Sequence, residues 1–195
     1  IKYIEDFKLQ NFEKNPVVIC SLGDNSVTEG EVAEAFQFAA LQQLPIIFLV
    51  QDNEWGISVT KEEARTSDAY DYAAGFVGLN RMRIDGTDFV ESFIQMQKAV
   101  HFVREERKPL LVCAKTVLIG HHTSGVRREF YRDEADLAKH RAKDPGIILK
   151  KYLLEEGFNE ETLSQIEIQA RKQIEEDFNK AILAPDPKPE TVKEH

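Results

Sequence analysis

Two apolar runs, each followed directly by polar residues, constrain the fold of this chain more than any other feature. The first run is Val17–Leu22 and the second is Pro45–Val50, and a helix fits between them. Strand, helix and strand in that order predict a βαβ unit, in which the two strands are parallel and buried. The fold class is therefore predicted to be α/β, a mostly parallel sheet flanked by helices.

Periodicity and turn signals extend this prediction along the chain. We expect strands at about 17–22, 46–51, 79–84 and 110–114, and helices at about 29–43, 69–76 and 89–106. Thr28 with Glu31 has the spacing of a capping box for the first of these helices. Beyond Asp133 the chain is predicted to be helical, with Asp144 and Pro145 starting one helix, Gly157 ending it and Asn159 starting the next.

Oxygen-bearing side chains follow the first two strands of the predicted sheet. Asp24 comes after the first strand and Asn53 after the second. The carboxyl ends of neighbouring parallel strands form the edge where ligands bind in open α/β sheets. Mg²⁺ takes oxygen ligands, often one or two from protein and the rest from phosphate and water, and a backbone carbonyl near Trp55 is a further candidate. The spacing therefore fits a magnesium–diphosphate site, although Asp and Asn after strands are also ordinary turn formers.

A third strand carries a histidine pair to the same edge. The apolar run 110–114 leads into a loop that contains His121 and His122. Because parallel strands share one carboxyl edge, we expect this loop to approach Asp24 and Asn53.

Composition excludes several classes of function. The chain has 195 residues and a net charge of −9, which argues against a general nucleic-acid surface. No apolar run approaches the roughly 20 residues of a membrane span. The two cysteines, Cys20 and Cys113, lie in strand-like apolar runs, which favours buried free thiols and a reducing compartment over a disulfide.

Several motifs together resemble the E1 α subunit of the thiamine diphosphate-dependent 2-oxoacid dehydrogenases. Gly23-Asp24-Asn25 followed by Asp52-Asn53 resembles the paired cofactor motif of thiamine diphosphate enzymes, and His121-His122 before a hydroxyl residue most resembles the branched-chain type. The match runs from about residue 15 to about 190. It also includes Ser26–Glu31, Ala35–Ala40, Leu44–Phe48, Trp55–Ser58, Ile84–Asp88, Ile119–Ser124, Tyr131–Arg132, Lys143–Pro145 and Tyr152–Leu154.

The resemblance assigns roles to individual positions. It implies that Asp24, Asn53 and the Trp55 carbonyl bind Mg²⁺, and that His122 faces the active centre as the catalytic residue. Asn25 and Ser26 inherit contacts to the diphosphate. The full set of implied cofactor-binding residues is Gly23, Asp24, Asn25, Ser26, Gln51, Asn53, Trp55, Ile57 and His122.

Some positions depart from the family pattern. Asn25 replaces a glycine, Asp52 replaces an asparagine, and Gln51 and Leu118 stand where arginines are usual. We expect these changes to weaken diphosphate binding by removing positive charge and adding negative charge, unless Arg127 or Arg128 compensates. Thr123 and Ser124 occupy positions that animal relatives phosphorylate, and an ordinary polar loop is the simpler interpretation.

The resemblance also implies a fold, an activity and partners. Residues 1–130 are expected to be the C-terminal part of a thiamine diphosphate-binding α/β domain, 131–184 a helical extension and 185–195 an extended tail. The expected reaction is oxidative decarboxylation of a branched-chain 2-oxoacid, with acyl transfer to a lipoyl-bearing E2. It needs a preceding segment and an E1 β subunit or fused β domain, in an α₂β₂-type assembly, with no nucleic-acid or membrane partner. The location is then cytoplasmic in a bacterium or the mitochondrial matrix in a eukaryote.

Two alternatives remain open at this point. A pyruvate or acetoin dehydrogenase E1 α has the same architecture. A non-catalytic assembly or regulatory domain that kept the fold and lost the cofactor is favoured by Gln51, Asp52 and Leu118, and opposed by the retained Asp24, Asn53 and His122.

Overall fold

The computed structural model describes residues 15–193, and the chain divides into two units, residues 1–149 and 150–195. Residues 1–14 and 194–195, which fall in the first and last predicted segments, lie outside the described residues. The boundary between the units falls within helix α7 (Pro145–Glu155).

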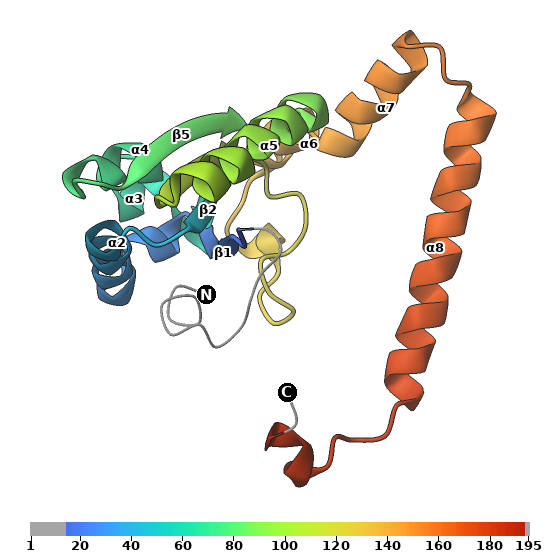
Figure 1. The fold of residues 1–195 in the computed structure, drawn as a ribbon. Coiled ribbons are helices and arrows are strands. Elements are labelled where there is room, and N and C mark those ends of the chain that lie inside the picture. The colour runs from blue at the N-terminus through green and yellow to red at the C-terminus, as the bar shows by residue number, and fades with distance from the viewer. Residues whose placement is uncertain (1–14, 194–195) are drawn as a thin grey trace. The chain divides into compact units, whose positions relative to one another are not determined.

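Unit 1 is built on a four-stranded parallel sheet with the order β1-β2-β6-β5 (Figure 1). The strands are β1 (Val18–Gly23), β2 (Ile46–Asp52), β5 (Asn80–Asp85) and β6 (Leu110–Lys115). The β1–β2 connection runs through α2 (Gly30–Gln42), so the βαβ unit predicted from the two apolar runs is confirmed, and β5, α5 (Phe89–Glu106) and β6 form a second βαβ connection. The α/β fold class is likewise confirmed.

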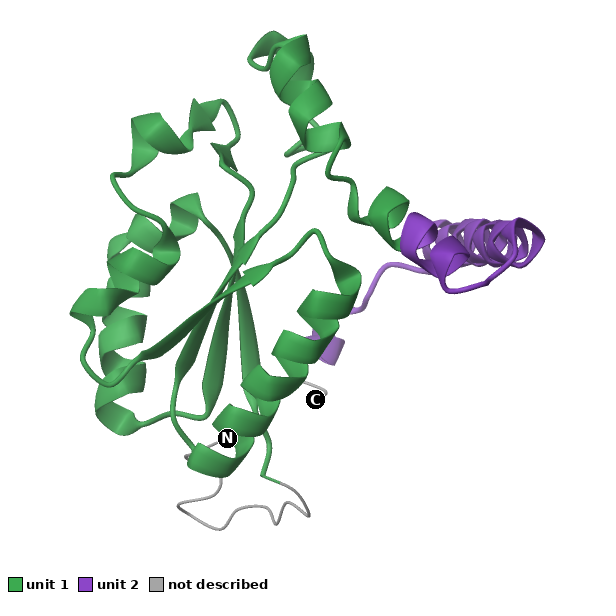
Figure 2. Ribbon diagram, turned by 90° about the horizontal axis from the view of Figure 1, so that it is seen from above, with its two compact units in different colours: residues 1–149 green, residues 150–195 purple. Residues whose placement is uncertain are grey.

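Helices cover both faces of the sheet, as Figure 2 shows. One face packs against α2 and α4 (Ala69–Tyr72), where Phe36 meets Phe48 edge-on with ring centroids 4.8 Å apart. The other face packs against α5 through Ala99 and Val103. Because side chains alternate along a strand, each central strand contributes to both apolar clusters. For example, Val50 lies in the first cluster and Ile47 in the second.

Short elements complete unit 1. They are η1 (Asn25–Thr28), β3 (Trp55–Gly56), β4 (Val59–Thr60), α3 (Lys61–Ala64), η2 (Ala73–Gly75), η3 (Arg128–Phe130) and α6 (Glu134–Arg141).

The predicted capping box at the start of α2 is wrong. Thr28 is the last residue of η1, and its hydroxyl donates to the Asn25 carbonyl instead of capping the helix. Glu29 is the residue before α2 and makes no side-chain cap hydrogen bond. The polar residues that follow β1 form a separate 3₁₀ turn, which places the helix start beyond the reach of Thr28.

The C-terminal helices begin and end where capping chemistry predicted. α7 begins at Pro145, and Gly157 adopts a φ of +92° shortly after the helix ends. The Asn159 side chain accepts from the Thr162 amide at the start of α8 (Glu160–Leu183). The segment predicted as an extended tail contains a short 3₁₀ helix, η4 (Pro189–Lys193). Within residues 15–193, every helix is too short or too polar to cross a bilayer.

Candidate functional site

The carboxyl ends of the four strands bring polar residues to one edge of the sheet, as the sequence predicted. β1 ends beside β2, with Gly23 opposite Gln51, and Asp52 and Asp85 both lie opposite Lys115 of β6. Ligands bind at this edge in open α/β sheets, so the side chains that follow the strands define the candidate site.

Asp24 ties the ends of β1 and β2 together. Its side chain is buried, and its Oδ1 accepts from the Asn25 amide while its Oδ2 accepts from the Glu54 amide at 3.1 Å. Asp24 also comes directly before η1. Burial raises the pKa of this carboxyl, and the neighbouring Arg65 opposes that rise.

Arg65 is a buried cation between two buried carboxylates. One guanidinium nitrogen, Nη2, lies 2.7 Å from Asp24 Oδ2 and 2.8 Å from Asp52 Oδ1. The other, Nη1, donates to Asn25 Oδ1 at 2.7 Å. Only 6% of the arginine side chain is exposed, against 3% and 0% for the two aspartates. The chain therefore places its own positive charge at Asp24.

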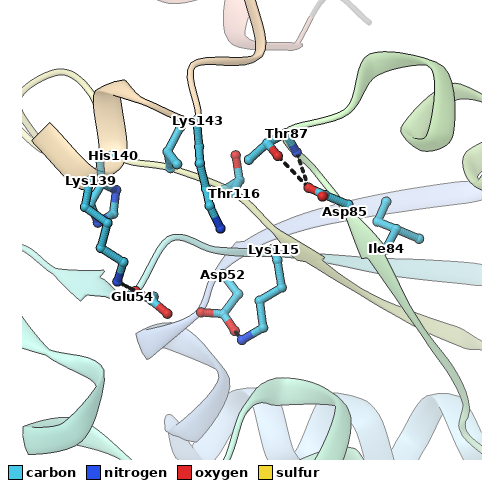
Figure 3. Close-up of a pocket in the computed structure, with 11 residues that line it drawn as sticks. Asp52, Glu54, Ile84, Asp85, Thr87, Lys115, Thr116, Lys139, His140 and Lys143 are labelled. Carbon is cyan, nitrogen blue, oxygen red and sulfur yellow. Dashed lines mark hydrogen bonds and ion pairs between the residues drawn. The ribbon is translucent and has the colours of Figure 1, made fainter. Parts of the chain in front are cut away.

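Asp52 has a second cationic partner. Lys115 donates to its Oδ2, as Figure 3 shows, so this carboxylate is shared between a lysine and an arginine. The negative charge of Asp52 is therefore compensated within the chain by two cations.

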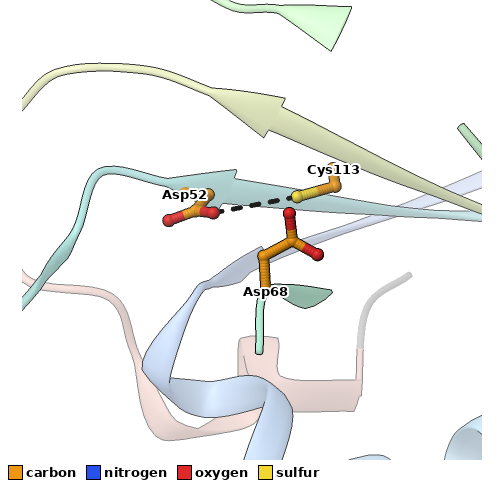
Figure 4. A group of neighbouring side chains, drawn as sticks. All are labelled: Asp52, Asp68 and Cys113. Atoms are coloured by element: carbon orange, nitrogen blue, oxygen red, sulfur yellow. Dashed lines mark hydrogen bonds between the residues drawn. The ribbon is translucent and has the colours of Figure 1, made fainter. Parts of the chain in front are cut away.

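Asp52, Asp68 and Cys113 form a compact group (Figure 4). Their candidate ligand atoms lie within 4.8 Å of one another, and the thiol lies 3.9 Å from Asp52 Oδ2. Burial raises the pKa of Cys113 to about 11. Lys115 already lies near both carboxylates of this group and supplies positive charge there.

The residues after Asp52 make local hydrogen bonds and pack inward. Asn53 Oδ1 accepts from the Trp55 amide at 3.0 Å, and Trp55 is buried. The indole lies against the Tyr131 ring, with centroids 5.7 Å apart, and beneath the Arg132 guanidinium, 5.1 Å from the ring centroid. The Trp55 side chain thereby joins the site edge to the segment that follows the histidine loop.

The remaining predicted site residues lie at or near this edge. Gly23 ends β1, Ser26 is exposed in η1, and Ile57 has a φ of +58° in the turn between β3 and β4. Gln51 is exposed and donates to the Ser21 hydroxyl at 2.9 Å.

The histidine loop, which contains His121 and His122, follows β6. His121 and His122 are both exposed, and His121 Nδ1 accepts from the Arg128 amide. Among the residues the structure describes, His122 makes no hydrogen bond or ion pair to Asp24 or Asn53. Its placement in the active centre stays a prediction.

A pocket of about 320 Å³ opens at the ends of β2, β5 and β6 (Figure 3). Within it, Lys139 donates to Glu54 at 2.9 Å. Burial acts to raise the pKa of Glu54, but hydrogen bonds from Lys61 and Lys139 outweigh it and lower the pKa to about 2. The lining residues are Asp52, Glu54, Ile84, Asp85, Thr87, Lys115, Thr116, Val117, Lys139, His140 and Lys143.

His140 lies in the last turn of α6 but is buried, and its Nδ1 accepts from the Leu118 amide at 3.0 Å. Burial lowers the pKa of the imidazole, and the adjacent Arg132 lowers it further. Arg132 also donates to the Leu118 carbonyl, so both side chains hold the base of the histidine loop.

Comparison with known proteins identifies the family. Residues 7–190 match the family described as Dehydrogenase E1 component. The chain belongs to this family.

Relatives within the family are named for two different substrates, pyruvate and 3-methyl-2-oxobutanoate. The chain is 31% identical to the pyruvate dehydrogenase E1 component subunit alpha of Rickettsia felis, over 83% of this chain and 50% of that protein. It is also 31% identical to the 3-methyl-2-oxobutanoate dehydrogenase subunit alpha of Mycobacterium tuberculosis, over 91% and 48%. The chain thus spans about half the length of these relatives. Among solved structures, it is similar to transketolase from Campylobacter jejuni, with 25% identity, 51% and 15% coverage and a TM-score of 0.45.

Asp24 and Asn53 carry the oxygen ligands that a hard cation such as Mg²⁺ prefers. Asp24 offers a buried carboxylate and Asn53 an amide oxygen, which are the ligand types that Mg²⁺ takes. The ion pair between the Arg65 guanidinium and Asp24 shows that this carboxylate binds positive charge. The donor set therefore fits a divalent cation, although an arginine of the chain lies at the same carboxylate.

Proposed function

We propose that this chain is part of an E1 α-type component of a 2-oxoacid dehydrogenase and forms the diphosphate-binding side of its thiamine diphosphate site. The observation that carries the proposal is the buried Asp24 carboxylate at the carboxyl end of β1, hydrogen-bonded to the backbone at the end of β2. Family membership supports the same assignment.

The proposed roles follow from the chemistry of each group. Asp24, Asn53 and the Trp55 backbone would hold Mg²⁺, and Asn25 and Ser26 would face the diphosphate. Thiamine diphosphate, when bound, supplies the electron sink for decarboxylation. The protein's share is positioning and charge. The buried Trp55 fixes the backbone next to Asn53, while Arg132 and His140 hold the base of the loop that carries His122, the proposed catalytic residue.

The proposed substrate is a branched-chain 2-oxoacid, and the acyl acceptor is a lipoyl group on an E2 partner. The His121-His122 doublet favours this over pyruvate, while the relatives include proteins named for each substrate. The proposal includes an E1 β subunit or fused β domain and a location in the cytoplasm of a bacterium or the mitochondrial matrix. The ratio of kcat/KM for 3-methyl-2-oxobutanoate to that for pyruvate tests this choice in the assembled enzyme. A ratio below one would reject the branched-chain assignment.

The second candidate is a non-catalytic domain of the same fold. The close ion pair between Arg65 and Asp24 favours it, because the carboxylate that would bind the metal already has a cation.

Cofactor binding separates the two candidates. Trp55 is the only tryptophan, so its fluorescence reports on the site when Mg²⁺–thiamine diphosphate is titrated into the chain in complex with its β subunit. We expect a saturable change that EDTA removes and that Asp24→Ala abolishes. Asp177→Ala serves as the control, since Asp177 is an exposed residue of α8 paired with Lys180. No change in fluorescence and no heat of binding by calorimetry would reject the cofactor role and leave the non-catalytic candidate.

A further inference from the structure

The strongest unexplained feature of this site is the buried arginine at its centre. We propose that Arg65 is the resident cation of the Asp24–Asp52 pair, and that a divalent cation binds at Asp24 only by displacing it. The inference deepens the proposed function and rests on it for the identity of the site.

Electrostatics explain why a cation is needed here. The side chains of Asp24 and Asp52 are 3% and 0% exposed, and two ionised carboxylates at such burial repel each other and lose their hydration. The Arg65 Nη2 group lies within 2.8 Å of one oxygen of each, so a single guanidinium offsets part of this repulsion. Removing that cation would leave two buried charges with Lys115 as the remaining partner, which lies against Asp52.

Asp52 and Asn25 supply the anchors for this arginine. Asp52 accepts from Nη2 and Asn25 accepts from Nη1. An asparagine at 52 would offer no second negative charge, and a glycine at 25 would offer no side-chain acceptor. The residues present at both positions therefore favour the arginine at the carboxylate over a metal ion.

A cavity next to Arg65 gives its side chain a second position when it is displaced from Asp24. Arg65 follows the short helix α3, and it lines a surface cavity of about 370 Å³ that also contains Asp68 and Asp71. Both carboxylates already pair with Arg83, so a guanidinium that leaves Asp24 for this cavity would share them with it. Meanwhile α3 itself is held in place, because Lys61 pairs with Glu54 at 2.6 Å and Thr60 forms a capping box with Glu63.

Manganese binding without any cofactor tests the proposal. Mn²⁺ replaces Mg²⁺ at oxygen sites, and its free form is measured by electron paramagnetic resonance. We expect weak binding to the wild-type 195-residue chain and binding at least about tenfold tighter in Arg65→Met, a change worth about 1.4 kcal/mol. Asp52→Asn removes one anchor of the arginine and should tighten Mn²⁺ binding in the same direction. Adding Asp24→Asn to Arg65→Met should abolish the gain, which assigns the new affinity to Asp24.

Arg81→Met is the matched control. It removes an equal charge from the same unit, but Arg81 donates to the Tyr70 carbonyl and lies over the Tyr70 ring, away from Asp24. Its Mn²⁺ affinity should equal that of the wild type. If Arg65→Met fails to fold, as judged by circular dichroism, Asp52→Asn decides alone.

Two results would overturn the proposal that Arg65 is the resident cation. One is wild-type Mn²⁺ affinity equal to that of folded Arg65→Met or Asp52→Asn, and the other is a gain that survives Asp24→Asn. Failure of the proposed function looks different: Asp52→Asn would bind Mn²⁺ tightly, while thiamine diphosphate would bind to none of the complexes with the β subunit.

Discussion

At the scale of single residues, the Asn25 side chain occupies the space where a side chain at position 56 would lie, so Gly56 has to be a glycine. A Cβ added at Gly56 would lie 1.9 Å from Asn25 Nδ2 and 3.0 Å from its Cβ. The asparagine has little freedom to move aside, because its Oδ1 accepts from Arg65. We therefore expect Gly56→Ala to lower the free energy of unfolding by about 1–3 kcal/mol, the usual cost of overpacking.

A double-mutant cycle tests this pair. Urea denaturation should show that Gly56→Ala costs much less in an Asn25→Gly background, because the blocking side chain is gone. An equal cost in both backgrounds would mean that the clash lies elsewhere.

Sequence reasoning found some residues of this site and missed others for physical reasons. Asp24 and Asn53 were predictable because they directly follow apolar strands. The carboxyl ends of parallel strands all lie at one edge of the sheet, so residues that follow them can be placed from the sequence. Arg65 lies after a four-residue helix without a periodic pattern, and its partner Asp24 is 41 positions away. The burial of His140 was not predictable, because it comes from the Leu118 segment, which no local pattern places beside α6.

At the scale of elements, the turn after β5 fixes where β6 ends. The Gly86 amide donates to the Lys115 carbonyl at 2.6 Å, and a Cβ at Gly86 would lie 2.7 Å from that same oxygen. The Lys115 carbonyl is backbone and cannot move aside as a flexible side chain could. Gly86→Ala should therefore lower the free energy of unfolding by about 2 kcal/mol or more. Gly30→Ala is the control, since Gly30 opens α2 with free space around its Cα, and it should change stability by less than about 0.5 kcal/mol. Comparable losses in both variants would contradict the close approach of the two strand ends.

The elements themselves were largely predictable because their signals are local. Apolar runs bounded by turns located β1, β2 and β6, and a 3.6-residue period located α5. The capping box at α2 failed because Thr28 belongs to the preceding 3₁₀ turn, a competition between two local structures that the spacing alone does not decide.

At the scale of the whole molecule, stability is concentrated in unit 1. Both apolar clusters consist of residues between 17 and 114, whereas most large apolar side chains of α8 are exposed, including Ile166, Ile174 and Phe178. A helix with so little burial draws its stability from local pairs, which contribute only tenths of a kcal/mol each. The two units should therefore unfold as separate events.

Truncation provides the test of that separation. A chain that ends at residue 149 keeps every residue of both clusters, and Trp55 reports on its folding. We expect its fluorescence-detected urea midpoint to match that of the full chain, with a difference in unfolding free energy below about 1 kcal/mol. The segment 150–195 alone should show partial, non-cooperative helicity by circular dichroism, because α8 is mostly exposed and helices draw most of their stability from tertiary packing. A large drop in the midpoint of the truncated chain would instead mean that residues 150–195 stabilise unit 1.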